Sequence, residues 1–237
     1  MIYRIINLMR YLILFFIFLC LLSKVYANER LFIAGTTSIR DSGLMEQISK
    51  AFETEYSEYG YELIFLIQGT RQSITIAKRG DVDVLLTHNK ELELDFVDSG
   101  YGIKRYNLMY NNFVIVGPKH DPALVRGSGN MKNVMTNIFN TKSNFVSRGD
   151  QSGTHLKELE LWKNSGLDVN NFENWYNKIG QGMGATLNMA NSIKAYTISD
   201  RATWLNFNNK DNLKIVFEND SKLINQYAII LVDHKKN

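Results

Sequence analysis

The sequence predicts an α/β fold in which buried strands alternate with helices. Short apolar runs at 31–34, 63–67 and 82–87 are each followed, after a few polar residues, by apolar positions at helical spacing. Continuous apolar runs of about four to eight residues are typical of strands buried on both faces of a parallel sheet. Because such strands alternate with helices, we expect βαβ units and a largely parallel sheet.

The rest of the chain continues this pattern with one longer strand. Positions 107–118 form a strand-like stretch long enough to cross between two lobes. Helices are expected at 131–139, after Ser152 and after the glycine-rich stretch 180–184, and strands at 195–199, 213–217 and 227–232. Residues 169–178 are interpreted as helical, with Trp162, Trp175 and Tyr176 as core aromatics.

The first 27 residues have the features of a secretory signal peptide. Arg4 and Arg10 flank the start of an unbroken apolar run at 11–22, and the segment ends in small residues at Ala27. The one cysteine of the chain, Cys20, lies in this run, so the mature protein is expected to have neither a thiol nor a disulfide. We therefore expect an exported, periplasmic protein that is free of the membrane.

Removal of residues 1–27 also removes the net charge. The full chain has 27 basic and 24 acidic side chains, and the basic residues Arg4, Arg10 and Lys24 account for the difference. A balanced mature chain argues against a general polyanion-binding surface, and hence against nucleic acid as a partner. Any anion binding must be local.

Hydroxyl-rich loops follow three of the expected strands. The residues concerned are Thr37 and Ser38, then Gly69 and Thr70, then Arg148, Ser152, Gly153 and Thr154. Ligands of open α/β sheets bind beyond the carboxyl ends of the strands. A helix that starts there offers unpaired N–H groups and the positive end of its dipole. With hydroxyl donors and a guanidinium added, these loops suit a small oxyanion.

Each loop also has a simpler interpretation as a helix cap. Ser152 or Thr154 could satisfy the first N–H groups of the helix that follows, as Asp41 or Ser42 could for an earlier helix. A function of another class is a secreted serine hydrolase that uses Ser152 with His155 as its base. The sequence lacks a Gly-x-Ser-x-Gly elbow at Ser152, which disfavours this function. The four histidines have no zinc-ligand spacing, so no metal cation site is expected.

Several motifs, taken in chain order, carry a resemblance to one family. They are Thr36-Thr37-Ser38 with Asp41-Ser42-Gly43, the runs 80–88 and 109–118, Ser147-Arg148-Gly149-Asp150 with Ser152-Gly153-Thr154-His155, Trp175-Tyr176, the run 180–184, and Ala195-Tyr196-Thr197 with Asp200-Arg201. In these residues the chain resembles the tungstate-binding proteins of bacterial tungstate ABC transporters. The resemblance implies a two-lobed periplasmic-binding-protein-like fold of type II. Each lobe would be a mostly parallel sheet flanked by helices, with the ligand cleft between the lobes.

The resemblance further implies capture of a tetrahedral oxyanion and its delivery to the membrane permease of an ABC transporter. The implied contacts are Thr37, Ser38, Gly69, Thr70, Arg148, Ser152, Gly153 and Thr154, with Arg148 neutralising charge. Tungstate is expected first and molybdate second, although the two share charge, shape and nearly the same size, so this preference rests on the resemblance. Phosphate or sulfate is the alternative ligand. We expect a monomer without enzymatic activity and without a cofactor.

The implied boundaries place lobe 1 at 28–112, with 229–237 returning towards it, and lobe 2 at 113–228.

The chain departs from the family pattern at two places. Arg71 stands where the family has a second glycine after Gly69-Thr70, and we expect it to alter the 69–73 loop or to add a positive charge near the cleft. The chain also stops at Asn237, where family members continue with helices that pack on lobe 1. We expect reduced stability or altered lobe packing from this second departure.

Overall fold

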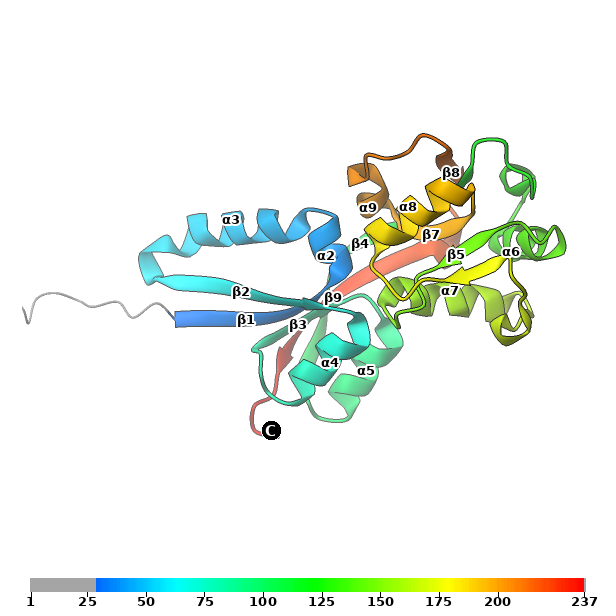
Figure 1. Cartoon of the computed structure of the whole chain (residues 1–237). Helices are drawn as coiled ribbons and strands as arrows, with labels where there is room; N and C mark the ends of the chain where they lie inside the picture. The colour runs from blue at the N-terminus through cyan, green and yellow to red at the C-terminus, as the bar shows by residue number, and fades with distance from the viewer. Residues whose placement is uncertain (1–28, 237) are drawn as a thin grey trace, which may run out of the picture.

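The computed structural model describes residues 29–236, so the expected signal peptide at 1–27 lies outside the described residues. Figure 1 shows two lobes joined by long strands. The main sheet has the strand order β2-β1-β3-β9-β4-β7, and β8 also pairs with β4. The strands are β1 (Glu29–Thr36), β2 (Tyr61–Gln68), β3 (Val84–Thr87), β4 (Gly102–Pro118), β7 (Thr197–Asp200), β8 (Leu213–Phe217) and β9 (Ile224–Val232). This arrangement confirms the expected two-lobed α/β fold.

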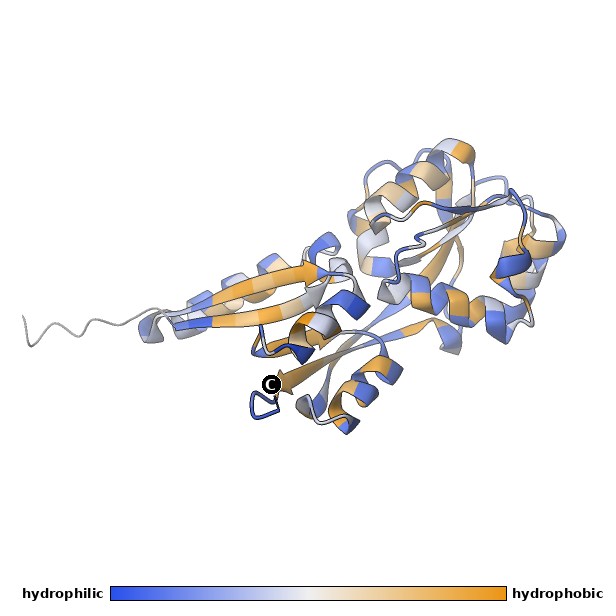
Figure 2. Cartoon of the chain, turned by 60° about the horizontal axis from the view of Figure 1, so that its bottom comes forward, coloured by the Kyte–Doolittle hydropathy of each residue, from blue (hydrophilic) through white to orange (hydrophobic). Residues whose placement is uncertain are grey.

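Lobe 1 is a three-layer unit around the parallel strands β2, β1 and β3. Helices α4 (Thr70–Lys78) and α5 (Lys90–Asp98) cover one face, where Ala34, Leu85 and Phe96 form part of a buried cluster. Helix α3 (Leu44–Tyr56) lies on the opposite face, as Figure 1 shows, and packs on side chains such as Ile33 and Phe65. Apolar residues follow both β1 and β2 in Figure 2, as expected for strands covered on two sides.

Lobe 2 surrounds the second half of β4. Its helices are α6 (Met131–Asn140), α7 (Gly153–Asn164), α8 (Met183–Ile193) and α9 (Arg201–Asn206), and its short strands are β5 (Phe145–Ser147) and β6 (Tyr176–Lys178). Helices α6 and α7 pack with aromatic residues in one cluster, while α8 and α9 pack in another on the other side of β4. In this lobe β5 and β6 pair in parallel, as the sequence predicts. Strands β7 and β8 are antiparallel to β4, because β4 enters this lobe from lobe 1.

The strands β4 and β9 connect the two lobes. β4 pairs with β9 over Gly102–Asn112 and with β7 and β8 over Phe113–Pro118. The burial of β4 changes at the same point as its pairing partners. The residues before Phe113 are mostly exposed or half-buried, and a continuous buried run begins at Phe113. The division of the lobes between 112 and 113 stays a prediction, and β4 changes its pairing partners at this point.

Two local predictions are wrong. Residues 169–178 form a 3-10 turn, Val169–Asn171, and strand β6 rather than a helix. The aromatic spacing that suggested a helix arises because Phe172, Trp175 and Tyr176 pack together around Trp162. The helix expected after Asp41 and Ser42 is present as α3, but neither residue is its N-cap, because Asp41 is the last residue of helix α2 (Thr37–Asp41) and Ser42 is the C-cap of α2.

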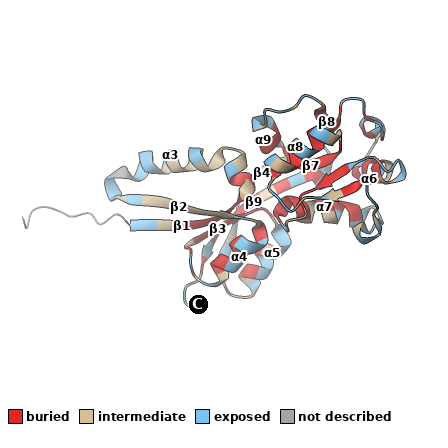
Figure 3. Ribbon diagram, in the orientation of Figure 1, coloured by how far each residue is buried: buried red, intermediate tan, exposed pale blue. Residues whose placement is uncertain are grey.

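Helix α3, at the far end of lobe 1, is poorly covered by the rest of the chain. Figure 3 shows exposed residues along α3, and no residue of this helix is fully buried. Tyr56, Tyr59 and Tyr61 form an exposed aromatic row at its end, with ring centroids 6.2 and 6.4 Å apart. Within residues 29–236, no helix combines the length and the hydropathy needed to cross a membrane.

Candidate oxyanion site between the lobes

Three helix N-termini meet where strands β1, β2 and β5 end. Thr36 and Gln68 are paired at the ends of β1 and β2, so helices α2 and α4 begin side by side. The Ser73 hydroxyl donates to the Gly35 carbonyl at 2.9 Å and holds α4 against β1. Neither Thr36 nor Gly69, the N-caps of α2 and α4, caps its helix with a side chain. The first N–H groups of both helices therefore remain available to a ligand.

The third N-terminus, that of α7, is reached through a tightly held loop. Gly149 and Gln151 have left-handed backbones, with φ of 62° and 58°. Such a conformation is unfavourable for a residue with a side chain, so the loop must be held by its hydrogen bonds. The Asp150 carboxylate accepts from the Ser152 N–H at 3.1 Å, and the Gln151 N–H donates to Nδ1 of His155 at 3.0 Å. The loop thus presents its side chains in a fixed arrangement.

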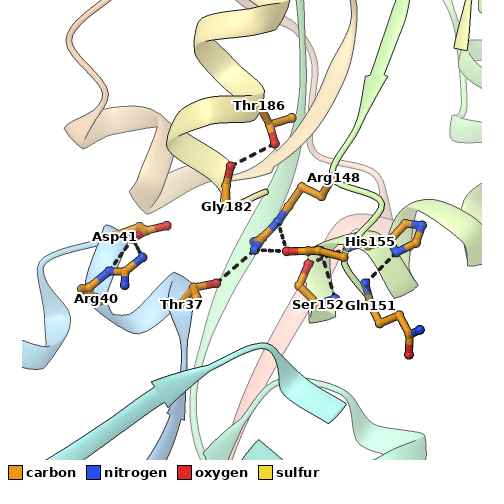
Figure 4. Close-up of polar contacts among 10 residues, drawn as sticks. Thr37, Arg40, Asp41, Arg148, Gln151, Ser152, His155, Gly182 and Thr186 are labelled. Atoms are coloured by element: carbon orange, nitrogen blue, oxygen red, sulfur yellow. Dashed lines mark hydrogen bonds and ion pairs between the residues drawn. The ribbon is translucent and has the colours of Figure 1, made fainter. Parts of the chain in front are cut away.

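Arg148 is the buried cation of this region. Its side chain is only 2% exposed. Nε and Nη2 donate to Oδ2 of Asp150 at 3.1 and 2.6 Å, and Nη2 also donates to Oγ1 of Thr37 at 3.2 Å. Figure 4 shows this side chain between the two lobes. Its Nη1 is buried without a hydrogen-bond partner, and an unsatisfied buried donor of a charged group is costly.

Five hydroxyl oxygens of the described residues share this condition, and three of them lie at these helix N-termini. Oγ1 of Thr36, Thr70 and Thr154 are all buried and have no hydrogen-bond partner. Thr36 and Thr70 belong to lobe 1 and Thr154 to lobe 2. Buried polar groups in native proteins are nearly always paired. Four orphan groups around three helix N-termini therefore indicate a missing hydrogen-bond acceptor, as an oxyanion would be.

The two lobes are in contact around this site. Gly153, the first residue of α7, is so close to lobe 1 that an added Cβ would lie 2.6 Å from Cε1 of His88 and 2.9 Å from Oγ1 of Thr70. The Asn206 amide also donates to the Ser42 carbonyl across the lobes at 2.6 Å. These contacts join the two lobes across the cleft, so the cleft is closed in this structure.

Comparisons with known proteins give the family. Residues 25–237 match the model of the PBP superfamily domain. A tungstate-binding protein TupA from Peptoclostridium acidaminophilum is 39% identical over 216 residues, which cover 90% of this chain and 74% of the relative. The chain belongs to the TupA family within the PBP superfamily.

Solved structures of the family agree with this assignment. The tungstate ABC transporter protein from Geobacter sulfurreducens is 41% identical with a TM-score of 0.78, covering 89% of this chain and 88% of that chain. TupA from Desulfovibrio alaskensis G20 is 38% identical with a TM-score of 0.74, covering 87% of this chain and 83% of that chain. The resemblance inferred from the motifs is confirmed.

The TupA-type fold brings most of the predicted site residues together. Thr37 contacts Arg148, Gly69 faces the backbone of Asp150 and Ser152, and Thr70 lies against Gly153. The Ser152 hydroxyl accepts a hydrogen bond from the backbone N–H of His155 at 3.3 Å. Ser152 therefore caps the N-terminus of α7, as the simpler interpretation of this loop predicted. Ser38 is buried and hydrogen-bonds the Tyr227 hydroxyl at the base of the site. Contacts of these residues with a ligand remain predictions.

Sequence reasoning missed several residues at this site. Thr36, Asp150, His88 and Tyr227 all lie among the predicted ones. His88 is buried, stacks on Tyr227 with ring centroids 4.7 Å apart, and shares a hydrogen bond of 2.8 Å between its Nδ1 and Oδ1 of Asn225. His88 directly follows β3, whose carboxyl end lies at the same edge as that of β1. The rule that selected the hydroxyl-rich loops, that ligands bind beyond the carboxyl ends of parallel strands, also points to His88.

The hydrolase alternative does not fit the positions of Ser152 and His155. A catalytic serine must have its hydroxyl within hydrogen-bond reach of the base's ring nitrogen. Here Nδ1 of His155 accepts from the Gln151 backbone, and the Ser152 hydroxyl accepts from the backbone N–H of His155. Both groups serve to fix the loop. In the described chain no cluster of three or more histidine, cysteine or acidic side chains could hold a metal cation.

Arg71 lies at the mouth of the cleft rather than in the buried site. It is exposed and lines a cavity of about 460 Å³ together with residues of the two facing loops. The other lining residues are Gln68, Gly69, Gln72, Gly149, Asp150 and Gln151. The expectation of an added positive charge near the cleft therefore agrees with its position, at the entrance.

Proposed function

We propose that the protein captures a tetrahedral oxyanion between its lobes, tungstate first and molybdate second, and delivers it to the permease of an ABC transporter. The observation that carries the proposal is the set of buried, unpartnered groups at the junction of three helix N-termini: Thr36, Thr70, Arg148 and Thr154. The names of the TupA relatives support tungstate as the ligand. The role is non-catalytic, the protein acts as a monomer, and it works outside the cytoplasm, in the periplasm.

The site has the composition that a buried dianion requires. Removing an anion from water is costly, and the cost must be offset by several donors at once. Each hydrogen bond to a charged group contributes about 1.5–3 kcal/mol. Arg148 supplies charge from lobe 2, while Thr37 and Thr70 with the starts of α2 and α4 supply donors from lobe 1. Ser152, Gly153 and Thr154 supply the start of α7, so only the closed form surrounds the ligand.

Phosphate and sulfate are the alternatives within the same class. Phosphate carries a proton near neutral pH, and binding it well requires an acceptor for that proton. Both oxygens of the Asp150 carboxylate already accept hydrogen bonds, from Arg148 and from Ser152, whereas Oδ2 of the buried Asp200 has no partner. The preference for tungstate and molybdate over phosphate and sulfate therefore rests on the named TupA relatives.

Calorimetric titration with tungstate, molybdate, sulfate and phosphate tests the proposal. We expect saturable one-to-one binding of tungstate, similar or weaker binding of molybdate, and much weaker binding of the other two. Tightest binding of phosphate or sulfate would replace the proposed ligand by the alternative. Failure of all four anions to bind would remove the proposed function.

Replacing Arg71 by alanine should slow association without emptying the site. A positive charge at the mouth of a cleft raises the local concentration of an anion, and this effect decreases with ionic strength. We expect an association rate roughly threefold lower at low salt, nearly normal at high salt, and a little-changed dissociation rate. Stopped-flow fluorescence of the tryptophans would measure both rates. Arg79→Ala removes the same charge from the other end of α4 and is the control, since it should leave the association rate unchanged.

A further inference from the structure

His88 is a buried titratable group at the base of the site, reached from both lobes. One edge of its ring is fixed within lobe 1, where Nδ1 bonds Oδ1 of Asn225 and the ring stacks on Tyr227. The opposite edge points at lobe 2. The point where a Cβ of Gly153 would lie is 2.7 Å from Nε2 of His88 and 2.9 Å from the unpartnered hydroxyl oxygen of Thr70. Nε2 of His88 and the unpartnered hydroxyl of Thr70 therefore both lie beside the start of α7.

The hydrogen bond to Asn225 determines what Nε2 can do. An amide oxygen only accepts, so Nδ1 carries a proton in this bond. In a neutral ring Nε2 then has a lone pair and repels a ligand oxygen. In a protonated ring Nε2 is a donor, and the ring adds a positive charge next to the ligand. The two states thus have opposite effects on a dianion.

The empty closed site favours the neutral ring. Burial lowers the pKa of His88 from 6.5 to about 4, and the positive charge of Arg148 acts in the same direction. Four charged side chains line the cavity on the other side of the ring, the cations Lys90 and Lys157 and the anions Glu91 and Glu160. A further carboxylate, that of the buried Asp200, acts on Tyr227, which stacks on the ring. Phe113 and Tyr227 contribute no charge near neutral pH.

The sign of the coupling follows from these positions. With the cleft open, a hydrated histidine has an ordinary pKa near 6.5. Between about pH 4 and 6.5, closing the empty cleft must expel the proton of His88, so empty closure becomes less favourable as the pH falls. A bound dianion reverses this, because two negative charges beside Nε2 favour the protonated ring.

We propose that His88 is a further residue of the oxyanion site, and that it takes up a proton from solvent at Nε2 when a dianion is enclosed. The site then holds two cations against the dianion, Arg148 from lobe 2 and His88 from lobe 1. Because closure on an empty site expels this proton, the same residue opposes closure without ligand. The proposal rests on the proposed oxyanion-binding function.

Calorimetry of molybdate and tungstate binding in buffers of different ionisation enthalpy measures the protons taken up. For the unaltered protein we expect proton uptake at about pH 6.5 that decreases towards pH 8, with an affinity that falls by up to about tenfold per pH unit as the pH rises. His88→Gln should bind more weakly near pH 6.5 and take up no proton. His120→Gln is the control, because His120 is an exposed histidine in the turn that follows β4, outside the site. It should behave as the parent.

A second variant keeps the test decisive if His88→Gln fails to fold. In Asn225→Asp the new carboxylate bonds Nδ1 and holds His88 protonated before the anion binds, so proton uptake should decrease although the histidine is intact. Binding by the unaltered protein without proton uptake, or uptake that persists in His88→Gln, would overturn the role of His88 and leave the proposed function in place. Absence of binding in the unaltered protein would overturn both.

Discussion

Replacing Arg148 by alanine is expected to weaken oxyanion binding by at least about thirtyfold and to leave no saturable binding in a micromolar titration. Truncation of one partner in a buried, hydrogen-bonded charge pair costs about 2–5 kcal/mol, and each 1.4 kcal/mol is about tenfold in affinity. The loss is large because Arg148 is buried and its removal leaves the Asp150 carboxylate without its cation. Isothermal titration with tungstate would measure it.

Two further variants show whether the loss of affinity comes from the charge and geometry of Arg148 itself. Arg148→Lys keeps the charge but loses the planar fork that bonds Asp150 and Thr37, so its affinity should lie between those of the parent and of the alanine variant. Arg40 makes a similar pair with Asp41 but is 53% exposed, and Arg40→Ala should bind normally. Figure 4 shows the Arg40–Asp41 pair and the side chain of Arg148. Tungstate binding of parental strength in Arg148→Ala, with an unchanged thermal melt, would refute the assignment of the site.

Replacing Gly153 by alanine should prevent the lobes from closing fully. The added methyl group would meet the His88 ring and the Thr70 hydroxyl of the opposite lobe at less than van der Waals distance. Overpacking of this kind costs about 1–3 kcal/mol, which corresponds to an affinity roughly five- to 150-fold lower. The stability of lobe 2 should not decrease, because alanine favours a helix more than glycine does. Titration with tungstate and small-angle scattering with and without ligand would measure affinity and closure.

Gly184→Ala is the control for this effect. Gly184 also lies in the first turn of a helix, α8, but nothing lies within 4 Å of an added Cβ. This variant should bind and contract as the parent does. If Gly153→Ala also contracted fully on tungstate and retained its affinity, the contact between α7 and His88 would have no part in closure.

The sequence was sufficient for the architecture because the buried strands are continuous apolar runs. It was also sufficient to choose the hydroxyl loops, since the ends of parallel strands meet at one edge whatever the details of packing. It misjudged 169–178, where aromatic residues at helical spacing pack around Trp162 without forming a helix. Spacing along the chain reports periodicity, and packing between distant segments can imitate it.

The individual roles at the site could not be derived in the same way. Ser38 was predicted as a ligand, and the structure shows its hydrogen bond to Tyr227, which follows it by almost the whole chain. Asp150 adjoins Arg148 in sequence, yet only the left-handed turn at Gly149 directs its carboxylate back onto the guanidinium. Contacts made through such turns or between the lobes depend on three-dimensional geometry that local patterns do not contain.

The place of β9 in the sheet affects the order in which the protein folds. This strand is the last of the described chain, yet it lies between β3 and β4 in the middle of the main sheet. The segments that build lobe 2 are contiguous in sequence, so this lobe can form its contacts as soon as they are synthesised. Lobe 1 cannot complete its sheet until β9 has been made, and pairing over such a sequence distance is intrinsically slow. Until then the facing edges of β3 and β4 lack their partner strand.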